Sequence, residues 1–179
     1  MLQSSPSRLS MNALKPSNGF NDAAPDHDKI FLKSSFFKEK RAPRLPIPAE
    51  VRAISKKSGN IRSASFNRPP PVMIPSLGLV VKYGADATVA EAQTQIMICK
   101  HLKGRVPVPE VFGWTEHGGQ VFIYMSLIEG ETLQERWGNM NENERQVVCE
   151  ELKCMVKAWR LLEQDSCSWR HDHYVGKFS

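Results

Sequence analysis

Lys82 and Glu91 are the two residues of this sequence whose types and spacing are best suited to chemistry. Lys82 lies at the end of an apolar run that predicts a strand over 77–83, and Glu91 lies near the start of a helical pattern over 87–101. A lysine at the end of a central strand loses hydration unless it is paired, and Glu91 is, after Asp86, the first carboxylate placed to approach it. In phosphoryl-transfer enzymes of the kinase kind, a lysine paired in this way holds the phosphates of ATP.

Glu91 also has a purely structural interpretation. Thr88 and Glu91 have the spacing of a capping box, in which the glutamate would close the start of the helix instead of pairing with a lysine. Both interpretations require a helix here, and the apolar residues recur at three- and four-residue steps: Val89, Ala92, Ile96 and Cys99.

A hairpin and a linker follow this helix. Apolar runs over 111–114 and 120–125 flank Gly118 and Gly119, whose tolerance of positive φ suits a hairpin turn. The second run leads directly into 126–130, which predicts a linker between two lobes. Such a linker offers backbone C=O and N–H groups to the edge of an adenine ring.

The remaining elements are expected as follows. Pro48 fits the first turn of a short helix that ends at Gly59, and 61–67 alternates weakly as a strand would. A triple proline ending at Pro71 marks a connection or an edge before a strand over 72–74. Thr132 with Glu135, and Asn141 with Glu144, are capping boxes that open a short and a long helix. The long helix carries one apolar stripe, which needs a partner to pack against: Val148, Leu152, Met155, Trp159 and Leu162.

Residues 1–44 have the composition of a flexible leader, since Ser, Asn, Pro and Lys prevail without sustained periodicity. Basic residues with phenylalanines between them suit nucleic acid or an anionic membrane surface, but no folded nucleic-acid motif accompanies them, so neither partner is expected. The basic residues are Lys29, Lys33, Lys38, Lys40, Arg41 and Arg44.

Composition is that of a globular protein, with 41% hydrophobic and 24% charged residues and a net charge of +5. No apolar run is long enough to span a membrane and the N-terminus lacks the pattern of a secretory signal, so a cytoplasmic location is expected. The four cysteines lack zinc-site spacing and are expected to be free thiols: Cys99, Cys149, Cys154 and Cys167.

The tract 45–164 resembles the N-terminal part of the aminoglycoside phosphotransferase family, in its kinase-like fungal branch. The stretches that carry the resemblance are Gly59-Asn-Ile-Arg, Phe66-Asn-Arg-Pro-Pro-Pro71, Leu79-Val-Val-Lys-Tyr-Gly84, Glu91-Ala92, Val106-Pro-Val-Pro-Glu-Val-Phe-Gly-Trp114, Gly118-Gly-Gln-Val-Phe-Ile-Tyr-Met125, Ile128-Glu-Gly-Glu-Thr-Leu133, Glu135-Arg-Trp137 and Met155-Val-Lys-Ala-Trp159.

The resemblance implies an ATP site. Lys82 would contact the ATP phosphates, with Glu91 as its partner on the helix. Met125 would guard the back of the adenine pocket, while the Ser126 carbonyl and the Ile128 amide would bind the adenine edge. ATP and magnesium serve the complete family. The loop that covers the phosphates would fall within 59–71, where no residue is assigned.

The resemblance stops short of the family's catalytic residues. The family's general base lies in a His-Gly-Asp loop, with a downstream Asn and a later metal-binding Asp. No match to these is found here, and His171-Asp172-His173 lies too soon after the long helix to replace them. No catalytic or metal-binding residue is therefore assigned.

The expected fold class is α+β. It comprises a disordered leader over 1–44, a kinase-like N-lobe of a small antiparallel sheet and one helix over 45–125, an inter-lobe linker over 126–130, and two helices of a truncated C-lobe over 131–179. The expected function is that of an inactive phosphotransferase-like fragment that contacts nucleotide. The alternative is a pseudokinase-type interaction module that docks or self-associates through the helix 142–163.

Overall fold

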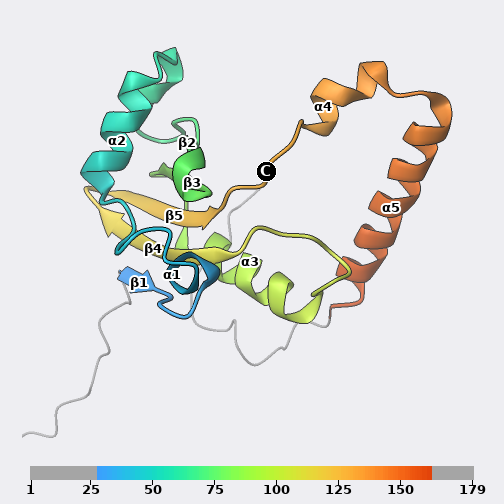
Figure 1. The fold of residues 1–179 in the computed structure, drawn as a ribbon, viewed down its shortest axis with the longest axis horizontal. Coiled ribbons are helices and arrows are strands. Elements are labelled where there is room, and N and C mark those ends of the chain that lie inside the picture. The colour runs from blue at the N-terminus through green and yellow to red at the C-terminus, as the bar shows by residue number, and fades with distance from the viewer. Residues whose placement is uncertain (1–27, 163–179) are drawn as a thin grey trace, which may run out of the picture.

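The computed structural model of the protein describes residues 28–162, which form an α+β fold around one five-stranded antiparallel sheet (Figure 1). The order of strands across the sheet is β1-β4-β5-β3-β2. Their bounds are β1 Asp28–Ile30, β2 Val72–Ile74, β3 Leu79–Gly84, β4 Val111–His117 and β5 Gln120–Ser126.

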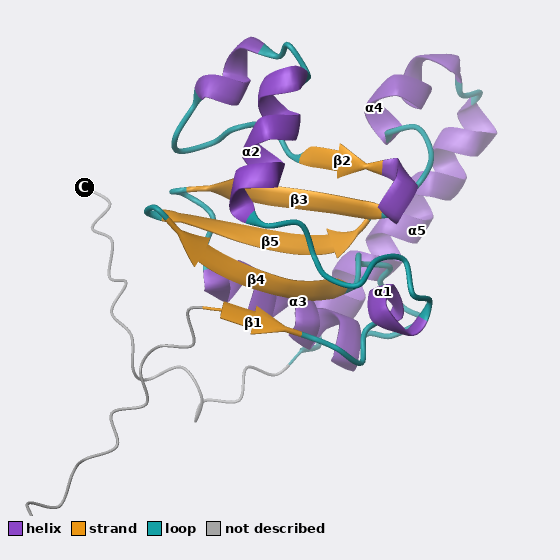
Figure 2. Cartoon of the chain, turned by 60° about the vertical axis from the view of Figure 1, so that its left-hand side comes forward, coloured by secondary structure: helices purple, strands orange, loops and turns teal. Residues whose placement is uncertain are grey.

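Helices cover both faces of this sheet. In Figure 2, α2 lies in front of the sheet and α3 lies behind it. The α-helices are α1 Ser35–Lys38, α2 Pro48–Lys57, α3 Val89–His101, α4 Leu133–Arg136 and α5 Glu142–Arg160.

Strand alternation divides the core into two clusters. The α2 side buries ten residues: Phe36, Leu45, Val51, Val72, Leu79, Val81, Tyr83, Phe112, Phe122 and Tyr124. The α3 side buries a smaller set: Ala87, Ala92, Val111, Trp114 and Ile123. Because successive side chains of a strand point to opposite faces, β4 and β5 contribute to both clusters.

Residues 28–44 differ from the expected flexible leader, because they are part of the fold. β1 pairs with β4, with Lys29 opposite Trp114, and the Phe31 amide donates to the Phe112 carbonyl at 2.9 Å. Phe36 of α1 is fully buried, and its ring lies 5.4 Å from that of Phe112. A few aromatic side chains therefore anchor a segment that average composition marks as disordered. The rest of the expected leader lies outside the described residues.

Glu50 fastens this segment to α2. Its carboxylate accepts hydrogen bonds from the Arg44 guanidinium at 2.7 and 2.8 Å and from the Ile47 amide at 2.9 Å. These bonds favour the charged carboxylate, the Arg44 bond most of all, and lower the pKa of Glu50 from 4.5 to about 2.

We expect the bonds of Glu50 to make stability depend on pH. A carboxylate whose pKa is lower in the folded state stabilises that state above its unfolded pKa, and the contribution is lost as pH falls through the folded value. The free energy of unfolding, measured with urea, should therefore be higher for the wild type than for Glu50→Gln at neutral pH. The difference should shrink between pH 4.5 and about pH 2. A difference independent of pH would contradict this assignment.

Most of the expected elements form, with two corrections. The expected strand at 61–67 is wrong, because Ile61–Ala64 is a 3-10 helix whose first turn is capped by the Asn60 side chain accepting from the Arg62 amide. The strand expected from residue 77 begins at Leu79, because Pro75–Leu77 forms another 3-10 turn that ends at Gly78, where φ is +54°.

The hairpin and the capping boxes of α4 and α5 are confirmed. Gly118 and Gly119 have φ of +62° and +73° between β4 and β5, as a two-residue turn requires. The Thr132 and Asn141 side chains accept from the amides of Glu135 and Glu144.

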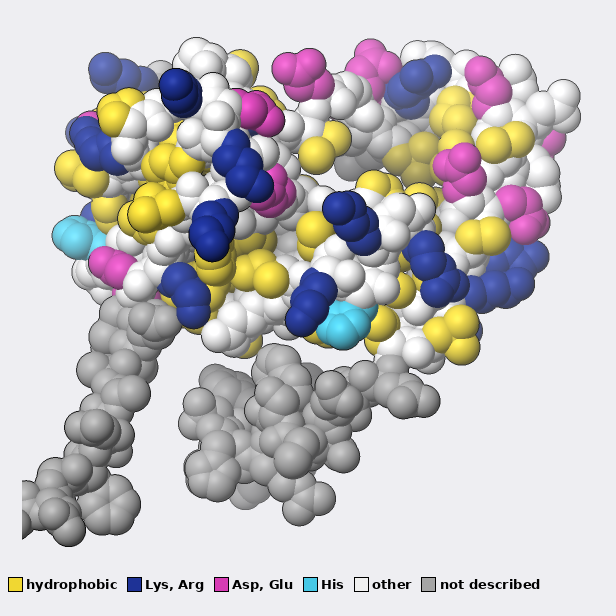
Figure 3. All heavy atoms as spheres, turned by 60° about the horizontal axis from the view of Figure 1, so that its bottom comes forward, with side chains coloured by type: hydrophobic (Ala, Val, Ile, Leu, Met, Phe, Trp, Pro, Cys, Tyr) yellow, Lys and Arg dark blue, Asp and Glu magenta, His cyan; other side chains and the backbone are white. Residues whose placement is uncertain are grey.

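The apolar stripe of α5 finds a partner along one edge only. Ala158 is buried against Leu102 and Val106 after α3, with Met155 and Leu162 beside them. Leu152 and Trp159 remain 45% and 47% exposed. Figure 3 shows apolar side chains at the surface on the α4 and α5 side of the molecule, among acidic ones.

Three of the cysteines, Cys99, Cys149 and Cys154, are free thiols as expected, whereas Cys167 lies outside the described residues. Within 28–162 no helix has the length and apolar character needed to cross a membrane.

Candidate functional site

Lys82 lies on the α3 face of the interior strand β3, between β5 and β2. Leu79, Val81 and Tyr83 point to the other face, where they join the core beneath α2. Lys82 is opposite Ile123 of β5, which is buried on the α3 side. The side chain of Lys82 is 44% exposed, so its ammonium group reaches solvent at the edge of this face.

Glu91 meets Lys82 from the first turn of α3. The Thr88 hydroxyl caps the helix by accepting from the Glu91 amide at 3.3 Å, which places the glutamate beside the sheet. The Glu91 carboxylate accepts a hydrogen bond from the Lys82 ammonium. The expected ion pair therefore forms. The Glu91 carboxylate binds the Lys82 ammonium, and the Thr88 hydroxyl caps the start of the helix.

The Lys82–Glu91 pair contributes little to stability. Both side chains are more than 40% exposed, at 44% and 41%, and pairs this exposed are worth ~0–1 kcal/mol. An ammonium group has three N–H donors, and Glu91 uses one of them, so two can reach phosphate oxygens. The pair therefore adds little to the fold, and the Lys82 ammonium keeps two N–H donors that Glu91 does not use.

Gln95 is a site residue that the sequence analysis missed. It follows Glu91 by one turn on α3, and its amide nitrogen donates to the Pro109 carbonyl at 2.7 Å and to the Met125 sulfur at 3.4 Å. The i, i+4 spacing from Glu91 was the available signal, since such residues share a helix face. Gln95 therefore holds Met125, the expected back of the adenine pocket, on the same face as Lys82.

The backbone at the start of the linker is held from both sides. The Ser126 amide donates to the Glu110 carbonyl at 2.9 Å, and the Glu110 amide donates to the Ser126 hydroxyl at 2.9 Å. The Leu127 amide donates to the Gly78 carbonyl at 2.9 Å on the β3 side. The Ser126 carbonyl belongs to the same trans peptide as the Leu127 amide, so it points away from β3.

Ile128 follows as an exposed residue of the linker, with 67% of its surface accessible. The structure thus brings Lys82, Glu91 and Met125 together on the α3 face and places Ser126 and Ile128 where β5 leaves the sheet. Within residues 28–162, the hydrogen bond and ion pair of Lys82 are with Glu91, and not with Ser126 or Ile128.

The stretch expected to cover phosphates packs at the far end of β3. The Ala85 and Asp86 amides donate to the Phe66 and Asn67 carbonyls, each at 3.2 Å. Gly84 permits this contact, because a Cβ there would lie 2.1 Å from the Asn67 carbonyl oxygen. A cavity of about 520 Å³ lies beside it, lined by residues that include Lys56, Asn60 and Ser63.

A second cavity, of about 550 Å³, lies between α4 and α5 and is lined by residues such as Arg136, Met140 and Asn143. Neither cavity includes Lys82 or Glu91. Within residues 28–162, no three His, Cys, Asp or Glu side chains gather closely enough to hold a metal ion.

Comparisons with models of protein families, with curated proteins and with solved structures find no match to this chain.

Proposed function

We propose that residues 45–130 form a kinase-like nucleotide-binding lobe and that this chain binds ATP on the α3 face of its sheet. The observation that carries the proposal is the Lys82–Glu91 ion pair between the interior strand β3 and the following helix α3. The sheet order supports it, since α3 connects β3 to the neighbouring hairpin whose last strand opens into the linker.

Each residue has a definite task in this proposal. Lys82 donates two N–H bonds to phosphate oxygens, and Glu91 fixes the position of the ammonium group. Met125, held by Gln95, closes the back of the adenine site. The Ser126 carbonyl accepts from the adenine amino group, and the Ile128 amide donates to a ring nitrogen.

The proposal is limited to binding. Phosphoryl transfer also requires a base and metal-ligating carboxylates, which the family that the chain resembles has in a His-Gly-Asp loop and beyond it. The 179 residues contain no His-Gly-Asp sequence. We therefore propose that this polypeptide by itself binds nucleotide without transferring a phosphoryl group.

Calorimetric titration of the full chain tests this function. ATP and ADP should bind more tightly than adenosine, because only the nucleotides have phosphates for Lys82. Equal affinity for adenosine, or no heat at millimolar ATP, would contradict the proposal. A sensitive assay for ATP hydrolysis on the same sample should show no turnover above buffer.

The exposed apolar face of α5 favours a second candidate function, self-association through two copies of this helix. This face is formed by Leu152, Val156 and Trp159, which are 45%, 40% and 47% exposed. Large apolar side chains that gather on one side of a helix mark an interaction surface. The two functions are compatible, because α5 packs near the C-terminal end of α3, around Ile98 and Leu102, whereas Glu91 lies in the first turn of that helix.

We expect the mass measured by sedimentation equilibrium to rise with protein concentration for the wild type and to stay monomeric for Leu152→Glu, because a carboxylate in that face opposes burial. Gln146→Glu adds the same charge about 120° around α5 from Leu152 and should leave association unchanged. A monomeric wild type at all concentrations would rule out this candidate.

A further inference from the structure

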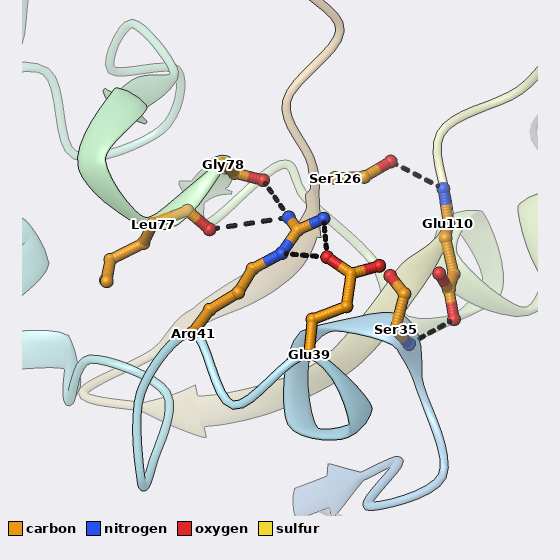
Figure 4. A network of polar contacts seen from close by, with 7 residues as sticks. All are labelled: Ser35, Glu39, Arg41, Leu77, Gly78, Glu110 and Ser126. Carbon is orange, nitrogen blue, oxygen red and sulfur yellow. Dashed lines mark hydrogen bonds and ion pairs between the residues drawn. The ribbon is translucent and has the colours of Figure 1, made fainter.

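Arg41 and Glu110 connect the segment 28–44 to both sides of the linker root, which is Ser126 and Leu127, where β5 leads into the linker. Figure 4 shows these contacts around Arg41, Glu110 and Ser126. The Arg41 guanidinium donates to the Gly78 carbonyl at 3.1 Å and to the Leu77 carbonyl at 3.5 Å. The Gly78 carbonyl is the same group that accepts from the Leu127 amide at 2.9 Å. Arg41 and the linker thus meet at one oxygen atom.

Glu110 makes the second connection. Its carboxylate accepts from the Ser35 amide at the start of α1, at 3.1 Å. Its backbone amide and carbonyl hold the Ser126 hydroxyl and amide, each at 2.9 Å. The segment that contains α1 therefore contacts the linker root on the β3 side through Arg41 and on the β4 side through Glu110.

Arg41 is itself fixed in place. Glu39 accepts from its Nε and Nη2 atoms at 2.9 and 2.7 Å, and its guanidinium lies 6.0 Å from the centre of the Phe112 ring. Gly78 allows the close approach, because a Cβ there would lie 2.5 Å from Arg41 Nη1. A side chain held by the Glu39 carboxylate and the Phe112 ring can position the Gly78 carbonyl, since little of its own freedom remains to be lost.

We propose that the segment 34–41 is a built-in support for the linker, with Arg41 as a positioning residue for the adenine ring of a bound nucleotide. Arg41 does not touch the nucleotide. Its hydrogen bond positions the Gly78 carbonyl, and that carbonyl in turn positions the Leu127 amide. The Leu127 amide and the Ser126 carbonyl belong to one peptide group, and the adenine amino group would meet this carbonyl. This inference rests on the proposed function and assigns a role in it to a segment outside the resembling tract.

Two readouts on the full chain test the support. In Arg41→Gln, hydrogen exchange of the Leu127 amide, followed by NMR, should be about tenfold faster, as loss of a ~1.4 kcal/mol restraint implies. Amides in the middle of β5 should exchange at wild-type rates, because a local loosening leaves global stability unchanged. A uniform rise across the sheet would show that Arg41 only stabilises the fold, and would overturn the proposal.

The second readout compares two ligands. Arg41→Gln should weaken ATP binding about fivefold and leave the binding of inorganic triphosphate unchanged, because triphosphate uses Lys82 alone. Arg41→Lys keeps the positive charge and an ammonium group that can donate to the Gly78 carbonyl, so it should recover part of the ATP affinity. Lys38→Gln removes an exposed charge from the same segment and should behave as the wild type.

The possible failures are distinguishable. If the wild-type chain binds no ATP, the proposed function falls and the role of Arg41 in it falls as well. If ATP binds equally well to the wild type and to Arg41→Gln, or if Leu127 exchange is the same in both, only the supporting role of Arg41 is wrong.

Discussion

Lys82→Met is expected to weaken ATP binding by about tenfold or more while leaving the thermal unfolding temperature nearly unchanged. The ammonium group would make charge-assisted hydrogen bonds to phosphate, and such bonds are worth ~1.5–3 kcal/mol each. The side chains of Lys82 and Glu91 are 44% and 41% exposed, so breaking their ion pair should lower the free energy of unfolding by only ~0–1 kcal/mol. Calorimetric titration and thermal unfolding on the same samples separate the two effects.

Matched variants show whether position or charge is responsible. Lys153→Met breaks another exposed Lys–Glu pair, with Glu150 on α5, and should bind ATP as the wild type does. Glu91→Gln keeps the Lys82 ammonium group but removes the carboxylate that holds it in position. Its loss of ATP affinity should therefore be smaller than that of Lys82→Met. Equal ATP affinity in Lys82→Met and the wild type would remove Lys82 from the site.

Phe36→Ala is expected to produce the largest loss of stability, of about 3–5 kcal/mol, in a segment that composition marks as a flexible leader. Phe36 is fully buried and packs against Phe37 and Phe112, with ring centres 5.1 and 5.4 Å away. Truncation would leave a cavity between α1 and the sheet that the fixed strands cannot fill. Urea unfolding of the purified variant measures the loss.

Leu32→Ala is the matched control, because Leu32 lies in the same segment and is 71% exposed. It should change the free energy of unfolding by less than about 0.5 kcal/mol. If Phe36→Ala unfolds the chain entirely, Phe36→Leu keeps most of the volume and should give a measurable, smaller loss. Equal stability of Phe36→Ala and Leu32→Ala would mean that the segment does not dock.

Local signals predicted the fold where neighbouring residues decide it. Gly118 and Gly119 set the hairpin because a two-residue turn demands positive φ, and Thr132 and Asn141 mark helix starts because their side chains satisfy free amides. The 3-10 helix at Ile61–Ala64 was not predicted, since a weak alternation resembles a strand and the Asn60 cap decides otherwise. Likewise, composition missed the docking of β1, which depends on pairing with a distant strand.

The same distinction applies to the site. The Lys82–Glu91 contact could be predicted because both residues flank one strand-to-helix connection. For Gln95 the i, i+4 spacing from Glu91 indicated a shared helix face, but not its contacts with Pro109 and Met125. Glu110 and Arg41 had no such signal, because each acts through a backbone group that the sheet brings near. Arg41 reaches Gly78 across 37 positions of sequence, and no periodic pattern records such a contact.

The position of bound ATP tests the central claim most directly. Amide chemical shifts of the isotope-labelled chain, followed during titration with ATP, report which residues the nucleotide approaches. We predict that the largest changes occur at Lys82, Leu127 and Ile128, and that Met140 and Asn143, beside the cavity between α4 and α5, change little. Changes centred on that cavity, or no change at millimolar ATP, would contradict a nucleotide site on the α3 face of the sheet.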